Sequence, residues 1–96
     1  MATFIALLDY TNQGIQNLHE SPQRADAFNE YAERNGVKIV RQYWTIGSHD
    51  GVLILEAPSD EVAASVLLHL GAGGNVRTTT LRAYEWAEAQ ELIESS

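Results

Sequence analysis

Residues 52–57, Val52-Leu53-Ile54-Leu55-Glu56-Ala57, decide the fold of this chain. Successive side chains of a β-strand point to opposite faces of the sheet, so a strand that is apolar at neighbouring positions has both faces buried. Residues 4–8, Phe4-Ile5-Ala6-Leu7-Leu8, repeat the pattern near the N-terminus. Two strands of this kind predict a sheet that is covered on both sides.

Helix signals separate these strands. Ser21-Pro22 is typical of an N-cap followed by a first-turn proline, and Asn35-Gly36 is typical of a helix end. Ser59 is a second N-cap, and Gly71 ends the helix that follows it. The sequence predicts strands at 4–10, 37–46, 52–57 and 76–84, helices at 22–34 and 60–70, and a terminal helix at 86–94 that packs against the rest.

The order β-α-β-β-α-β is that of an α+β, ferredoxin-like domain with a four-stranded antiparallel sheet, and we expect it to span residues 1–96 as a single unit. Two helices cover only one face of such a sheet. Large exposed apolar surfaces are rare on monomers, so the other face needs a partner. We therefore expect a homodimer packed through the sheet face, as a dimeric α/β barrel, or a higher oligomer built from it.

Composition excludes several classes of function. The formal net charge of −7 opposes binding to nucleic-acid backbones and to anionic membranes. The absence of cysteine excludes disulfides, thiolate metal sites and a cysteine nucleophile. The first residues lack a basic segment and a cleavage site, and their apolar run is too short to cross a membrane, so we expect a cytoplasmic protein.

The chain resembles the GYD-domain family over nearly its whole length. The resemblance lies in residues 4–11 with Gly14-Ile15, in residues 42–52, 56–61 and 74–83, in the Ser21-Pro22-Gln23-Arg24 segment, and in Gly47-Ser48-His49-Asp50, where the family has Gly-x-Tyr-Asp. It implies membership of the dimeric α/β-barrel group, in agreement with the fold predicted above. It implies no particular activity, because related families include mono-oxygenases, haem-degrading enzymes, isomerases and ligand binders.

His49 and Asp50 are the candidate catalytic pair. A histidine transfers protons near neutral pH, and a carboxylate beside it can orient the ring. In the alternative interpretation, Asp50 organises the turn through backbone hydrogen bonds while His49 lies in solvent.

Four further residues are candidates for ligand binding. Tyr43 and Trp44 point to opposite faces of their strand, so one of them could line an aromatic pocket. The alternative is that each packs in the core or in an interface. Arg82 and Tyr84 share a face and could hold a carboxylate or an enolate, the alternative being an ion pair between Arg82 and one of the many acids.

We expect no cofactor and no metal. His19, His49 and His69 lack the spacing of a metal site, and the dipole at the end of its helix accounts better for His69. The glycine-rich segment 71–75 follows a helix and precedes a strand, which is the wrong order for a phosphate-binding loop.

Three functions remain open. The first is a dimer that binds a small apolar or aromatic molecule or serves as an oligomeric scaffold. The second is a cofactor-independent mono-oxygenase or isomerase with His49 as base and Arg82 or Tyr84 as oxyanion partner. The third is a regulatory module that binds other proteins. The enzyme requires a cavity on which His49 converges with a second polar group.

Overall fold

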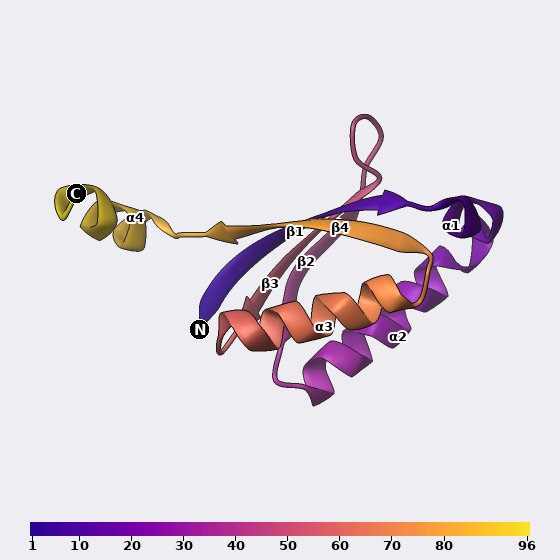
Figure 1. The fold of residues 1–96 in the computed structure, drawn as a ribbon, viewed down its shortest axis with the longest axis horizontal. Coiled ribbons are helices and arrows are strands. Elements are labelled where there is room, and N and C mark those ends of the chain that lie inside the picture. Colours follow the sequence, from indigo (N-terminus) through magenta and orange to yellow (C-terminus); the bar gives the residue numbers. More distant parts are fainter.

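The computed structural model describes residues 1–96 throughout. The predicted strands and helices are all present, with shifts of a few residues at their ends. In chain order the elements are β1 (Ala2–Tyr10), α1 (Asn12–Gln16), the 3-10 turn η1 (Leu18–Glu20), α2 (Ser21–Arg34), β2 (Lys38–Trp44), β3 (Gly51–Ala57), α3 (Asp60–Ala72), β4 (Val76–Ala83) and α4 (Trp86–Glu94) (Figure 1).

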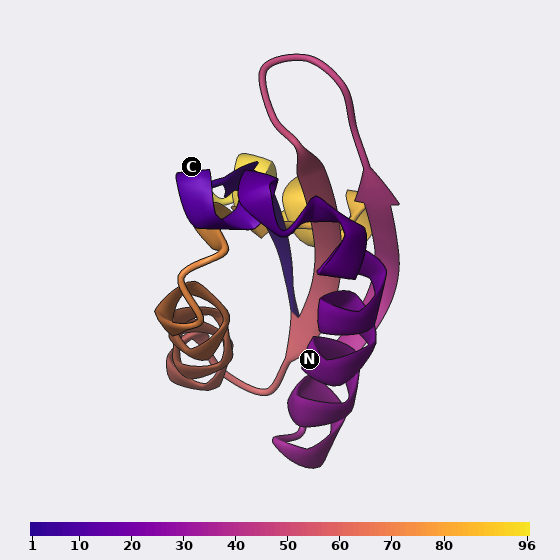
Figure 2. The same ribbon diagram turned by 90° about the vertical axis from the view of Figure 1, so that its right-hand side faces the viewer.

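The four strands form one antiparallel sheet in the order β2-β3-β1-β4. Helices α2 and α3 lie side by side on one face of this sheet (Figure 1). The arrangement is the ferredoxin-like α+β fold that the element order predicts. The loop between β2 and β3 projects beyond the sheet in both views (Figure 2).

The hydrophobic core lies between the sheet and helices α2 and α3. Alternate residues of β1 and β3 point into it, and Leu53 and Leu55 are at most 1% exposed. Burying a leucine of this kind stabilises the fold by about 1.5–3 kcal/mol. The core residues are Phe4, Ala6, Phe28, Ala32, Val37, Leu53, Leu55, Ala57, Ala63, Val66 and Leu67.

The opposite face of the sheet carries no helix, and we call it the open face. Its apolar centre includes Ile5 and Ile54, which are partly exposed, and Tyr43 and Leu81, which are 53% and 47% exposed. Both faces of β1 and β3 are therefore apolar, as the sequence predicts. From the strand register, the open face consists of Thr3, Ile5, Leu7, Asp9, Lys38, Arg41, Tyr43, Val52, Ile54, Glu56, Arg77, Thr79, Leu81 and Ala83.

One strand departs from the predicted alternation. Ile39 pairs with Leu55 and Arg41 pairs with Ile54, so Val40 is an extra residue in a β-bulge. The bulge places Ile39 on the helix side together with Trp44, whereas simple alternation put Ile39 on the face of Arg41 and Tyr43. Strict alternation along residues 37–46 therefore fails at Ile39, because a single inserted residue reverses it.

The position of the terminal helix also differs from the expectation. The predicted span, residues 86–94, is confirmed, but α4 stands away from the rest of the molecule (Figure 1). None of its residues is buried, and Trp86 is 78% exposed. The expectation that this helix packs within its own chain was wrong, since only the extended segment at Tyr84 and Glu85 connects it to β4.

Candidate functional site

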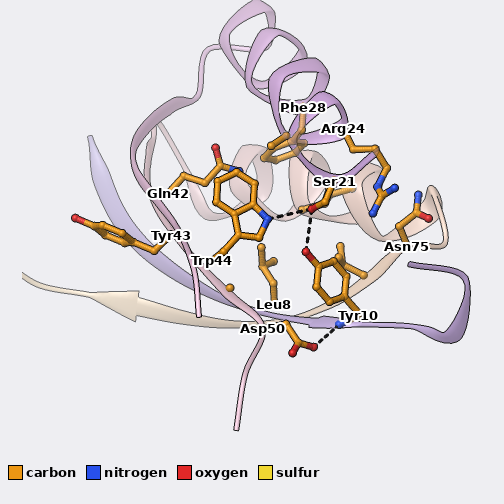
Figure 3. A pocket seen from close by; sticks show the side chains of 14 residues that line it. Leu8, Tyr10, Ser21, Arg24, Phe28, Gln42, Tyr43, Trp44, Asp50 and Asn75 are labelled. Atoms are coloured by element: carbon orange, nitrogen blue, oxygen red, sulfur yellow. Dashed lines mark hydrogen bonds between the residues drawn. The ribbon is translucent and has the colours of Figure 1, made fainter. Parts of the chain in front are cut away.

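A small pocket lies between α2, the end of α3 and the sheet. Apolar side chains from all three form its interior, and polar groups gather at its rim (Figure 3). Its lining residues are Leu8, Tyr10, Ser21, Arg24, Ala25, Phe28, Gln42, Tyr43, Trp44, Asp50, Gly51, Leu70, Asn75 and Val76.

The pocket is small for a ligand site. Its volume is about 80 Å³, whereas pockets for drug-sized ligands measure about 300–1,000 Å³. An engineered cavity of about 150 Å³ holds one benzene molecule. The space is thus suited to a few water molecules. A buried nitrogen of Arg24, Nη2, has no partner within the protein and is a group that such water would satisfy.

A hydrogen-bond network closes one side of the pocket. The indole Nε1 of Trp44 donates to Ser21 Oγ at 3.0 Å, and the Tyr10 hydroxyl lies 2.9 Å from the same oxygen. Ser21 therefore ties the start of α2 to β1 and β2 (Figure 3). Its predicted role as an N-cap was wrong, because α2 already begins at Ser21 and the preceding Glu20 makes no side-chain cap.

Asp50 is engaged by the sheet. Its carboxylate Oδ2 accepts the backbone N–H of Tyr10 at 2.9 Å, and its own N–H donates to the carbonyl of Leu8 at 2.8 Å. These bonds continue the ladder between β1 and β3 past Gly51. They match the backbone-organising role that is the alternative to catalysis for Asp50, although the partners lie across the sheet and not within the turn.

His49 lies beside Asp9 and makes no hydrogen bond with Asp50. The distance from His49 Nδ1 to Asp9 Oδ1 is 3.1 Å, and the two side chains are about one-third exposed. Asp9 belongs to the open face, whereas Asp50 lines the pocket. The structure thus places the two candidate catalytic residues in different surroundings. Asp9 was not predicted as a partner, because nothing in the sequence links residues 40 positions apart.

Tyr43 and Trp44 occupy opposite faces, as the sequence predicts. Trp44 pairs with Gly51 and covers the pocket, while the Tyr43 ring points away from it (Figure 3). Arg82 and Tyr84 do lie together, with the guanidinium 4.3 Å from the tyrosine ring centre. Arg82 is six residues along β4 from Val76 of the pocket, a separation of about 20 Å. The structure does not bring this pair to His49 or to the pocket.

Of the 14 lining residues, the sequence singles out Tyr43, Trp44 and Asp50 as site candidates; Tyr10, Ser21 and Phe28 are among those that it does not. Alternation along β1 would have found Tyr10, which shares its face with Phe4 and Leu8. The Ser21-Pro22 pattern indicates a helix cap and gives no signal for a contact between elements.

The histidines do not form a cluster. His69 stacks on Tyr31 with the ring centres 3.6 Å apart, joining α3 to α2. No group of three or more metal-ligating side chains lies close enough to hold a metal ion. None of the helices combines the length and the hydropathy that a membrane crossing requires.

The open face has the anatomy of a protein interface. Its strands place the residues in rows, and the two central rows are largely apolar. Lys38 and Glu56 are cross-strand neighbours at one end of the face, and Asp9 and Arg77 are cross-strand neighbours at the other. An apolar centre with a polar rim is typical of protein–protein contacts. Each end therefore carries both signs of charge.

The fold and these two sites define a ferredoxin-like α+β domain with a small pocket and a broad uncovered sheet face. The GYD domain family model matches residues 4–93. The chain belongs to this family, as the resemblance in its sequence implied.

A relative from Thermus thermophilus is called "Glutamine synthetase and cystathionine beta-lyase binding protein". It is 38% identical over 89 residues, which cover 92% of this chain and 94% of that protein. No solved structure matches the chain significantly.

Proposed function

We propose that the chain forms a homodimer through the open face of its sheet and that this dimer is a non-catalytic module that binds other proteins. The observation that carries the proposal is the open face itself, which is apolar at its centre and carries no helix. A second copy is the occupant that we propose, because an apolar sheet face of this kind can pack on its own copy about a two-fold axis.

The dimensions of the pocket support a binding module over an enzyme or a small-ligand carrier. A volume of about 80 Å³ leaves little room for an aromatic substrate or ligand. The enzyme hypothesis also requires a polar group that meets His49 at a cavity. Asp9 is the group beside His49, and it lies on the open face.

The name of the Thermus relative supplies candidate partners. We propose glutamine synthetase and cystathionine beta-lyase from the source organism as the first two proteins to test, because a relative of nearly the same length is named for binding them. The proposal includes a cytoplasmic location, with which the cysteine-free composition is compatible.

Titration calorimetry of the purified chain against each purified enzyme tests the partner proposal. We expect binding to at least one of them with a dissociation constant of about 1 µM or tighter, about −8 kcal/mol. An unrelated oligomeric enzyme of similar size is the control. Absence of heat with both candidate enzymes, or equal heat with the control enzyme, would contradict the partner assignment.

A further inference from the structure

Helix α4 has an apolar side that nothing in its own chain covers. At 100° per residue, Trp86, Ala89, Leu92 and Ile93 fall within one arc, and Glu88, Glu91 and Glu94 fall outside it. Trp86 and Ile93 are 78% and 72% exposed. A helix of nine residues is too short to be stable alone in water, even with the capping box at Glu85 and Glu88. The helix therefore requires a binding surface on another molecule.

We propose that α4 docks on a second copy of the chain, in a groove at the corner between α2 and β2. The inference rests on the homodimer proposed above. In that dimer, α4 of each copy occupies the groove of the other copy.

The groove is an open depression of about 480 Å³. Val37 and Ile39 are its two apolar lining residues, and Lys38 and Glu33 contribute its charges. Asn29 and Gly36 complete its lining. Arg34 follows Glu33 at the end of α2, and Arg41 lies beyond Ile39 on β2. Three of the six cations of the chain thus lie within eight residues of one another, next to a groove that has room for a bulky side chain.

The strand register indicates why α4 of one copy would meet this groove of the other. Lys38, Glu56, Thr3 and Ala83 form one row across the sheet, so the start of β2 and the end of β4 lie at the same end. When two sheets pack face to face about a two-fold axis parallel to their strands, β4 of one copy lies opposite β2 of the other. Because α4 follows Ala83 after two residues, it emerges beside the second copy's corner.

Charge supports the same occupant. The polar side of α4 carries three glutamates, and the corner carries Arg34, Lys38 and Arg41. Glu33 is the one acid lining the groove. Docking of the apolar arc brings the glutamates of α4 toward these three cations, which favours this corner in a chain whose formal net charge is −7.

Cross-linking of full-length variants tests the proposal, because the chain has no cysteine of its own. Ala89→Cys on α4 is mixed with Glu33→Cys at the groove, and a short bis-maleimide is added. Since each variant has one thiol, a product between the two variants reports a contact between copies. Ala64→Cys, exposed on α3, and Ser48→Cys, at the opposite end of the sheet, replace Glu33→Cys as controls. We expect linkage to residue 33 and little to either control.

A second measurement does not depend on cross-linking geometry. Trp86→Ser combined with Ile93→Ser in the full chain should raise the dimer dissociation constant about 30-fold, the effect of losing one interface hot spot of about 2 kcal/mol. Helical and strand signals in circular dichroism should persist, because α4 contributes nothing to the core.

The outcomes separate the two proposals. A dimer whose residue 89 links to positions 48 or 64 as readily as to position 33, or to none of them, overturns this docking and leaves the dimer standing. An unchanged dissociation constant for the Trp86 and Ile93 variant, together with loss of binding to a candidate enzyme, also overturns it and assigns α4 to that enzyme. A wild-type chain that sediments as a monomer overturns the homodimer and this docking with it.

Discussion

At the scale of single residues, the pocket region depends on one close contact between backbones. A Cβ atom on Gly14 would lie 2.0 Å from the carbonyl oxygen of Asn75. The same oxygen accepts the N–H of Thr11 at 3.0 Å, and the Thr11 hydroxyl accepts the N–H of Gly14 at 3.1 Å. These contacts join the end of β1 to the turn before β4, where Asn75 borders the pocket.

The first prediction concerns this contact. Gly14→Ala should lower the free energy of unfolding by about 2 kcal/mol or more, because the methyl group cannot fit against the backbone of Asn75. Gly71→Ala is the matched control, since only its chain neighbours and the backbone of its own helix lie within 4 Å of its Cβ position in α3. It should raise the free energy by up to about 1 kcal/mol. Urea denaturation measures both, and equal effects would refute the close contact.

The second prediction concerns the bridge at Ser21. Ser21→Ala removes the shared partner of Trp44 and Tyr10 and should cost about 1 kcal/mol of stability. The fluorescence of Trp44 should change at the same time, as its indole loses a fixed hydrogen bond. Ser65→Ala, on an exposed position of α3, should raise stability slightly through helix propensity and leave the fluorescence unchanged. A Ser21→Ala variant with unchanged stability and unchanged fluorescence would contradict a stabilising role for these hydrogen bonds.

At the scale of elements, the sequence predicts secondary structure better than it predicts where two of the elements point. The apolar pattern of β1 and β3 correctly assigns both of their faces, and the glutamates and apolar residues of 86–94 correctly predict a helix. The bulge in β2 leaves no mark in the sequence, since Val40 fits a strand as well as its neighbours do. The position of α4 does not follow from the contacts within one chain if its binding surface belongs to a second copy.

The sequence likewise predicts only part of the candidate site. Alternation correctly separates Tyr43 from Trp44, and it would have found Tyr10. It cannot show that His49 lies beside Asp9, because that contact depends on how a loop folds back over the sheet. Nor can it give the volume of a pocket, which depends on packing between α2, α3 and the sheet.

The third prediction belongs to β2. Deletion of Val40 should be tolerated with a loss of about 1–3 kcal/mol, because Ile39 and Arg41 already pair with consecutive residues of β3. Deletion of Gln42 should be worse, since it moves either Arg41 or Tyr43 toward the core side of the sheet. Thermal unfolding compares them. A Val40 deletion that unfolds the chain more than the Gln42 deletion would contradict the assigned bulge.

At the scale of the whole molecule, one sheet has two apolar faces and only one of them is covered within the chain. Neighbouring residues illustrate the difference. Leu55 is fully buried under the helices, while Ile54 lies partly exposed on the open face. Phe4 and Ile5 repeat this division on β1. In the proposed dimer the second face is buried against the other copy, whereas in a monomer it is exposed to solvent.

Sedimentation equilibrium of matched lysine variants tests that dimer most directly. The wild-type chain should sediment at twice its mass of 10.6 kDa. Ile54→Lys and Ile5→Lys should sediment as folded monomers, because each places a charge at the centre of the apolar contact. Leu55→Lys and Phe4→Lys should unfold, since each places an unpaired charge in the core. A monomeric wild type, or an Ile54→Lys variant that remains as dimeric as the wild type, would contradict the account.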